Sequence, residues 1–215
     1  MTVAAVSMVR DEADIIETTV RHMLTQVDVV IVADNRSVDG TREIVEQLPV
    51  HLLDDPERGY YQSEKMTRLA HMARVEHGAD WVVPFDADEW WYSPHGRIGD
   101  VLEGLDAWPI VTAELYDHVA TGVDPDGLSP VQSMGWRRRT AAPLPKVACR
   151  TAADLVIEQG NHGAHYDAPA PQTSGLVVRH FPYRSAEQFA RKAVNGAEAY
   201  AATDLPEDVG RHWRE

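Results

Sequence analysis

The sequence predicts an α/β protein with a mainly parallel central sheet, helices on both faces and a smaller mixed C-terminal part. Three observations lead to this fold class. Short apolar runs rich in β-branched residues alternate with segments of helical periodicity over residues 1–91. Turn-forming residues separate them, as in DNRSVDG at 34–40. Apolar residues make up 44% of the 215 residues, enough for one continuous core, so a single domain over 1–215 is expected.

The first half of the chain supplies the regular part of this pattern. A strand over 2–9 precedes a helix over 12–26 whose apolar residues share one face, with Asp11 as the expected N-cap. The next predicted elements are a strand over 28–33, a helix over 41–48, a strand over 50–54, a helix over 62–77 that Gly78 ends, and a strand over 80–85. Such a series favours parallel strands joined by right-handed crossovers.

The second half is less regular. Strands are expected over 109–116 and near 133–139, 146–150 and 176–181. A stretch rich in Gly, Pro and Asp over 117–130 is interpreted either as a mobile lid or as a simple connection. Ser185 and Gln188 have the spacing of a capping box at the start of a closing helix.

Composition and charge narrow the classes of partner and compartment. The formal net charge of −14 disfavours electrostatic attraction to nucleic acid or to an anionic membrane. Cys149 is the single cysteine, so an intramolecular disulfide and a cysteine-rich zinc site are excluded, and a buried structural role is expected for it. The N-terminus lacks a signal-peptide pattern, and no apolar run approaches the roughly 20 residues of a spanning helix. We therefore expect a cytoplasmic protein without a membrane anchor of its own.

Acidic residues follow three of the predicted parallel strands. They occur in the groups Arg10, Asp11 and Glu12, then Asp34 and Asn35, then Asp86, Asp88 and Glu89. Because ligands of open α/β sheets bind beyond the carboxyl ends of the strands, these groups are expected to meet at one edge. Like charges oppose folding unless a cation offsets them, and carboxylate and diphosphate oxygens suit Mg²⁺ or Mn²⁺. The pattern therefore predicts a divalent-metal site that also holds a diphosphate ligand.

Three motifs in order make the prediction more specific. They are MVRDEADIIETTVRHMLTQVDVVIVADNRSVDGTREIV, DWVVPFDADEWW and RHFPYRSAEQFARKA. With them the sequence resembles the family 2 type glycosyltransferases, in particular the branch with a DN-x-S-x-DGT loop and a D-x-D-E-[FW] motif. The resemblance is strong over residues 3–91 and returns over about 176–192, whereas 92–175 match poorly. It implies a GT-A fold with a nucleotide-sugar-binding half over 1–91 and an acceptor-side half with the closing helix over 92–215.

The resemblance also implies an activity and a nucleotide site. The protein would be a metal-dependent glycosyltransferase that moves a sugar from a nucleotide-sugar donor, a UDP-sugar in the first place, to a hydroxyl acceptor on a glycan, a protein or modified nucleic acid. Asp34 would bind the base or ribose. Arg10 and Glu12 would line the same pocket, and Lys65 would face the nucleotide.

Further roles follow for the acidic motif after the fourth predicted strand. Asp86 would contact ribose or sugar, and Asp86 and Asp88 would ligate Mn²⁺ or Mg²⁺. Glu89 and Trp90 would shape the donor-sugar site, which makes Asp88 and Glu89 candidate catalytic residues.

The C-terminal half holds candidates for the remaining parts of the site. Related enzymes often recruit a histidine from this half, so His162 and His180 are candidate metal ligands. Lys146 and Arg184 are interpreted as cations that neutralise the departing diphosphate or as ordinary surface charges.

Deprotonation of the acceptor requires a carboxylate base in an inverting enzyme. The Glu-Asp pair that usually marks this base in the family is absent from the second half of the sequence. Asp117, Glu158 and Asp167 are the candidates, and the stereochemical outcome stays open.

Several of the residues named above also have simpler structural interpretations. Ser37 and Asp39 suit turn or cap positions, Lys65 suits a solvent-facing helix position, and one of Trp90 and Trp91 is expected in the core.

Two further questions concern the acceptor and the reaction class. Residues 137–139, all arginine, form either a charged edge strand or a site for a polyanionic acceptor such as modified DNA, which the net charge disfavours. The alternative functions are a nucleotidyltransferase and a catalytically silent nucleotide-binding protein. A nucleotidyltransferase is expected to carry a Gly-rich basic loop after the first strand, where this chain has RDEAD.

Overall fold

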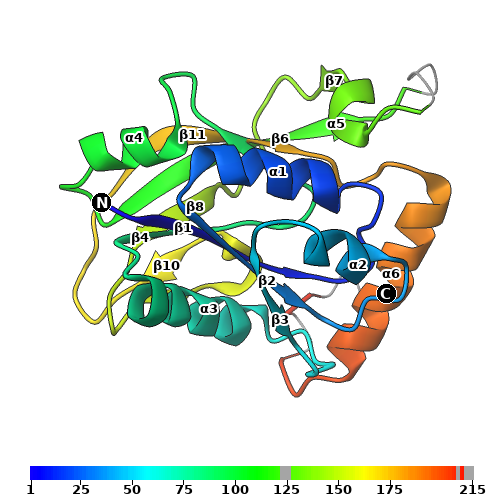
Figure 1. The fold of residues 1–215 in the computed structure, drawn as a ribbon, viewed down its shortest axis with the longest axis horizontal. Coiled ribbons are helices and arrows are strands. Elements are labelled where there is room, and N and C mark those ends of the chain that lie inside the picture. The colour runs from blue at the N-terminus through cyan, green and yellow to red at the C-terminus, as the bar shows by residue number, and fades with distance from the viewer. Residues whose placement is uncertain (122–126, 207–208, 211–215) are drawn as a thin grey trace.

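The computed structural model describes residues 1–121, 127–206 and 209–210 and has the predicted α/β architecture (Figure 1). The strands of the main sheet follow the order β3-β2-β1-β4-β8-β6-β11-β5, and β7 pairs with β6. Their bounds are β1 Val3–Val9, β2 Val29–Asp34, β3 His51–Asp54, β4 Trp81–Pro84, β5 Glu89–Tyr92, β6 Ile110–Val119, β7 Trp136–Arg137, β8 Lys146–Arg150 and β11 Gln172–His180. A separate hairpin pairs β9 Val156–Ile157 with β10 Ala164–His165.

Strand direction determines which residues lie at which edge of the sheet. β3, β2, β1 and β4 are parallel to one another, and β6 is parallel to β11. β8 runs antiparallel between β4 and β6, so β4 and β6 point the same way. The carboxyl ends of most strands therefore share one edge with the first residue of β8.

Helices cover both faces of the sheet (Figure 1). α1 Ile16–Gln26, α2 Thr41–Glu46 and α4 Ile98–Gly104 contribute to one core cluster, and α3 Gln62–His77 contributes to the other. β1 alternates between them, since Val3 and Ala5 belong to the first cluster and Ala4 and Val6 to the second. The remaining helical segments are α5 Pro130–Ser133, η1 Gln159–Asn161 and α6 Ala186–Ala201.

One detail of the predicted helix ends is confirmed, one is confirmed in part and one is wrong. Gly78 ends α3 in the left-handed region with φ of 63°, as expected. Ser185 accepts a hydrogen bond from the backbone N–H of Gln188, but the Gln188 side chain accepts from the backbone N–H of Arg184, so the capping box is not reciprocal at Ser185. Asp11 is not the N-cap of α1, because the helix begins at Ile16 and Asp11 itself adopts φ of 55°.

The second half departs further from the predicted elements. The strand expected near 133–139 is only the two residues of β7, because Ser129 and Pro130 start the short helix α5 just before it. β5, α4, η1 and the β9-β10 hairpin were not predicted. In the Gly-rich stretch, β6 extends to Val119, and residues 122–126 lie outside the described residues, so the choice between lid and connection stays a prediction.

Two buried residues confirm their predicted structural roles. Cys149 is fully buried in the α3-side core, and Trp91 is fully buried in the α1-side core. None of the helices over 1–121, 127–206 and 209–210 combines the length and the apolar character needed to cross a bilayer.

Candidate active site

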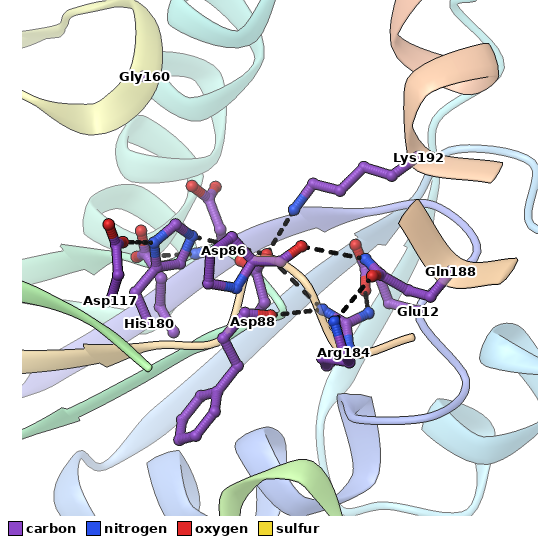
Figure 2. A network of polar contacts seen from close by, with 12 residues as sticks. Glu12, Asp86, Asp88, Asp117, Gly160, His180, Arg184, Gln188 and Lys192 are labelled. Atoms are coloured by element: carbon purple, nitrogen blue, oxygen red, sulfur yellow. Dashed lines mark hydrogen bonds and ion pairs between the residues drawn. The ribbon is translucent and has the colours of Figure 1, made fainter. Parts of the chain in front are cut away.

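The carboxyl edge of the sheet brings the predicted acidic residues together. Asp34 ends β2, Asp86 and Asp88 follow β4, and Asp117 lies near the end of β6. Because β8 is antiparallel to its neighbours, its first residue, Lys146, lies at the same edge. The close-up of this region shows acidic and basic side chains in one connected network (Figure 2).

Asp88 is buried and surrounded by cationic groups. Its Oδ2 atom accepts a hydrogen bond from the ammonium of Lys192 and lies 3.6 Å from Nε2 of His180 and 3.7 Å from Nη1 of Arg184. Burial alone would raise the pKa of Asp88, but Lys192 and His180 outweigh it and hold the pKa well below its ordinary value. Asp88 is therefore an anion at neutral pH.

His180 is held between two carboxylates (Figure 2). Its Nδ1 lies 2.8 Å from Oδ1 of Asp117, and its Nε2 faces Asp88. Burial would lower the pKa of His180, but Asp88 and Asp117 outweigh it and raise the pKa to about 9. A carboxylate on one ring nitrogen fixes the orientation of the other nitrogen, as in histidine metal ligands.

A second buried cation, Lys146, joins Asp86 to Glu89. Its ammonium lies 2.8 Å from Oδ2 of Asp86 and 2.7 Å from Oε1 of Glu89, and it donates a 2.8 Å hydrogen bond to the carbonyl of Gly160. Glu89 is fully buried, and this burial raises its pKa to about 7 although Lys146 opposes the shift. The Asp86 carboxylate also accepts a hydrogen bond from the Gln62 amide at 3.1 Å.

Asp34 and Lys65, both predicted to face the nucleotide, have different surroundings. Asp34 is buried, and none of the described residues donates a hydrogen bond to its Oδ1. Lys65 is also buried and pairs with Asp55 at 2.7 Å while donating to the carbonyl of Glu57 at 2.8 Å. The interpretation of Lys65 as a solvent-facing charge is therefore wrong, and Oδ1 of Asp34 is a buried acceptor without a partner among the described residues.

The segment after β1 is tied to the start of α6. Arg184 forms ion pairs with Glu12 and, at 2.7 Å, with Asp14. Burial and the nearby Asp88 raise the pKa of Glu12 to about 7, against the effect of Arg184. Arg10 reaches toward α6 as well, with its Nη2 3.8 Å from Glu198.

The chain is similar to known proteins in both sequence and fold. The sequence profile described as Glycosyl transferase family 2 matches residues 5–147, which is more than half of the chain. The chain belongs to glycosyl transferase family 2. No curated protein matches this family 2 chain in a separate comparison.

Solved structures agree with the family on the fold. The crystal structure of S. aureus TarS 1-349 is 14% identical, with a TM-score of 0.54 over 99% of this chain and 69% of that one. TarS 1-349 in complex with UDP-GlcNAc gives the same identity and TM-score over 99% and 70% of the two chains. The complex with UDP is 16% identical, with a TM-score of 0.52 over 99% and 69%. The expected GT-A fold is confirmed.

The family 2 chain places three predicted site residues outside the network around Asp88. Trp90 packs against His22 of α1, with ring centroids 4.1 Å apart, and stacks under Arg179. Glu158 is exposed beside His165 at 3.8 Å. Asp167 binds Asp154 through its backbone N–H, beyond the end of β8 opposite Lys146.

His162 lies nearer, but its described contacts are structural. Its Nδ1 is 2.9 Å from the carbonyl of Pro145, and its ring packs so closely on Gly160 that a Cβ there would lie 2.5 Å from the ring. Burial and Lys146 lower the pKa of His162, which keeps the imidazole neutral at neutral pH. No carboxylate of the described residues pairs with it.

Sequence reasoning missed three residues that complete the site. Lys192 contacts Asp88, while the amides of Gln62 and Asn161 contact Asp86. A signal for Lys192 exists, because Gln188, Lys192 and Asn195 follow helical spacing and form a polar stripe on α6. Gln62 and Asn161 have no comparable signal, since the first residue of α3 and the last residue of η1 meet Asp86 only in the folded chain.

The residues at Asp88 fit a divalent cation. Asp88 supplies a carboxylate oxygen, and Nε2 of His180, which Asp117 orients, would become a second ligand on loss of the proton that its raised pKa retains. Within the described parts of the chain no group of three or more His, Cys, Asp or Glu is arranged as a ready metal cluster. A site with one or two protein ligands is nonetheless usual for ions that complete their shell with water and substrate phosphates.

Proposed function

We propose that this family 2 protein transfers a sugar from a nucleotide-sugar donor, in the first place a UDP-sugar, to a hydroxyl acceptor, with Mn²⁺ or Mg²⁺ at Asp88. The single observation that carries the proposal is that Asp88, with His180 beside it, shares one sheet edge with the partly unpartnered Asp34. Two of the similar TarS structures are complexes with UDP and with UDP-GlcNAc, which supports the donor class.

The chain's own residues suggest how the donor is held. Asp34 offers its buried free oxygen to the nucleoside, and Asp86 is positioned by Lys146, Gln62 and Asn161 to contact ribose or sugar. A divalent cation, when bound, would neutralise charge that develops on the diphosphate. Arg184, already near Asp88, adds a fixed positive charge on the same side.

The acceptor is proposed to enter beside an apolar pocket at the start of α6. The pocket has a volume of about 390 Å³. Its exposed aromatic rings, Tyr183 and Phe189, meet edge to face at 5.2 Å, and such rings suit the apolar face of a sugar. Its lining residues are Ala120, Tyr183, Arg184, Ser185, Ala186 and Phe189.

Asp117 has two candidate roles that an experiment separates. Of the three candidate bases it alone contacts the network, through His180, and we propose that it orients this histidine. On this proposal Asp117→Asn weakens Mn²⁺ binding about 10-fold or more, the scale of other outer-shell changes. Unchanged Mn²⁺ affinity with loss of transfer would instead favour Asp117 as the base.

The two alternative functions predict different products. A nucleotidyltransferase would release pyrophosphate from a nucleoside triphosphate. The loop after β1, where such an enzyme binds phosphate, is acidic here. Its backbone N–H groups at Asp11 and Glu12 already donate hydrogen bonds to the hydroxyls of Ser37 and Thr41. Residues 10–14 therefore do not form the Gly-rich, basic phosphate-binding loop that a nucleotidyltransferase is expected to have. A catalytically silent protein would bind nucleotide without turnover.

The test is incubation with a panel of nucleotide sugars, with and without Mn²⁺, while released nucleotide is measured. We expect slow donor hydrolysis that requires Mn²⁺ and falls at least 100-fold in Asp88→Asn. Arg21→Met, an exposed change on α1, serves as the control. Pyrophosphate release from a triphosphate, or binding without hydrolysis under all conditions, would contradict the transferase.

A further inference from the structure

Lys192 contacts the carboxylate oxygen of Asp88 that a metal ion would bind on the proposed function. Its ammonium donates a hydrogen bond to Oδ2, the same oxygen that His180 and Arg184 approach at 3.6 and 3.7 Å (Figure 2). A divalent cation bound to this oxygen would lie about 2.0 to 2.1 Å from it in the case of Mg²⁺. The ammonium and the metal would therefore repel each other at Oδ2, where His180 and Arg184 add further positive charge.

The backbone that carries Lys192 is fixed, whereas the side chain is partly exposed. Asn195 binds Asp11 at 2.7 Å, and Arg191 lies 3.7 Å from Asp39, so α6 is anchored on both sides of Lys192. The Lys192 side chain is 26% exposed and makes its one described hydrogen bond to Asp88. A lysine stem has four rotatable carbons, so the ammonium can swing without moving the helix.

Lys146 shows what a permanent structural lysine looks like in the same site. Its side chain is only 5% exposed, and its ammonium contacts Asp86, Glu89 and a carbonyl at once. Displacing Lys146 would leave two carboxylates unpaired, one of them fully buried. Displacing Lys192 leaves Asp88 with His180 and Arg184.

We propose that Lys192 is an internal counter-ion that competes with the divalent metal for Asp88 and moves to the diphosphate of the donor when the metal binds. The inference rests on the proposed function, since it concerns the same metal and donor. It adds that metal and donor bind cooperatively, because the diphosphate gives the displaced ammonium a new partner.

The test measures Mn²⁺ binding by electron paramagnetic resonance in the wild type, Lys192→Met and Lys192→Arg. Without UDP, Lys192→Met is expected to bind Mn²⁺ about 10-fold more tightly, and Lys192→Arg as weakly as the wild type. Arg191→Met is the matched control, because it removes a neighbouring charge of α6 that pairs with Asp39 and not with Asp88. Circular dichroism verifies that each variant is folded.

A second measurement follows the displaced ammonium. At saturating Mn²⁺, UDP is expected to bind about 10-fold more weakly to Lys192→Met than to the wild type. Equal Mn²⁺ affinity of wild type and Lys192→Met would overturn the inference and leave the proposed function standing. If neither protein bound Mn²⁺ even with UDP, the proposed metal dependence would be contradicted, and the inference about Lys192, which depends on it, would be contradicted as well.

Discussion

Single residues at the carboxyl edge make large contributions because they are buried and charged. Lys146 is the clearest example, since its ammonium neutralises Asp86 and the fully buried Glu89. We expect Lys146→Met to lower the free energy of unfolding by about 3 to 5 kcal/mol, the range for removing one partner of a buried pair.

Urea unfolding measures this effect, with Arg21→Met as the control. Arg21 pairs with Glu17 on the exposed side of α1, so its loss is expected to change the free energy of unfolding by about 0.5 kcal/mol or less. Equal effects of the two substitutions would show that the buried ion pairs of Lys146 do not stabilise the fold.

Asp39 predicts a pH dependence away from the metal site. Burial would raise its pKa, but hydrogen bonds from Thr41 and from the backbone N–H of Ala13 outweigh it and lower the pKa below the ordinary 3.8. Its contribution to stability is therefore present above pH 3.8 and is lost as the pH falls through the lowered pKa. Asp39→Asn is expected to cost about 1 to 2 kcal/mol at pH 7 and much less near pH 2.

Unfolding at both pH values tests this prediction. Glu76→Gln, at an exposed position near the end of α3, provides the control with no expected pH-dependent difference. A difference between wild type and Asp39→Asn that stays constant from pH 7 to pH 2 would contradict the assignment of the effect to the carboxylate.

Residue identities alone predicted part of this site. Asp86, Asp88 and Asp34 follow strands, so their common edge could be deduced from strand direction. Lys146 was a candidate cation from the sequence, but its pairing with Asp86 and Glu89 could not be deduced in the same way, because it begins an antiparallel strand. Lys192 was missed, because it belongs to a helix about 100 residues after the motif. Ion pairs between segments so distant in sequence depend on the complete fold.

At the scale of elements, helix ends show where local sequence is decisive. Gly78 ends α3 at φ of 63°, and no atom of a neighbouring segment lies within 4 Å of the place that an alanine Cβ would take. Gly78→Ala is therefore expected to lower the free energy of unfolding by about 1 kcal/mol through backbone strain alone.

The matched control is Gly104→Ala at the end of α4. This site also has open space but does not need a left-handed backbone, so alanine is expected to leave stability unchanged or slightly higher. Thermal unfolding compares the two variants. An equal loss of stability in both would show that the backbone conformation at Gly78 is not the cause.

The regular β-α units were predictable because periodicity, caps and turns all lie within each unit. β5 was missed because its residues, EWWY, overlap the acidic motif and pair with β11, which is far along the chain. Asp11 resembled an N-cap, but its carboxylate instead accepts the backbone N–H of Val38 at 2.8 Å. A long-range contact replaced the local one.

At the scale of the whole molecule, α6 lies between the charged edge and the aromatic pocket. Phe189→Ala is expected to raise the KM for a phenyl glycoside used as acceptor probe about 10-fold, or about 1.4 kcal/mol, while donor hydrolysis is unchanged. Val194→Ala, an exposed apolar residue on the same helix outside the pocket, is the control. Parallel loss of donor hydrolysis and transfer in Phe189→Ala would place Phe189 on the donor side.

The overall architecture was predictable to the level of fold class and strand direction in the first half. The position of β8 between β4 and β6 was not, because an antiparallel strand inserted into a parallel sheet leaves no pattern in its own five residues. This insertion brings Lys146 to the site, so a strand that was predicted in place but not in its sheet position provides the cation on which Asp86 and Glu89 depend.

The inserted strand β8 carries a buried thiol whose reactivity reports on global opening of the fold. Cys149 is the single thiol, lies fully buried in β8, and is paired in register with both Val82 and Ile110. Burial raises the pKa of this thiol well above its ordinary value, so the intact protein is expected to resist alkylating reagents. The rate at which Cys149 is alkylated under native conditions would then measure how often the central strands separate.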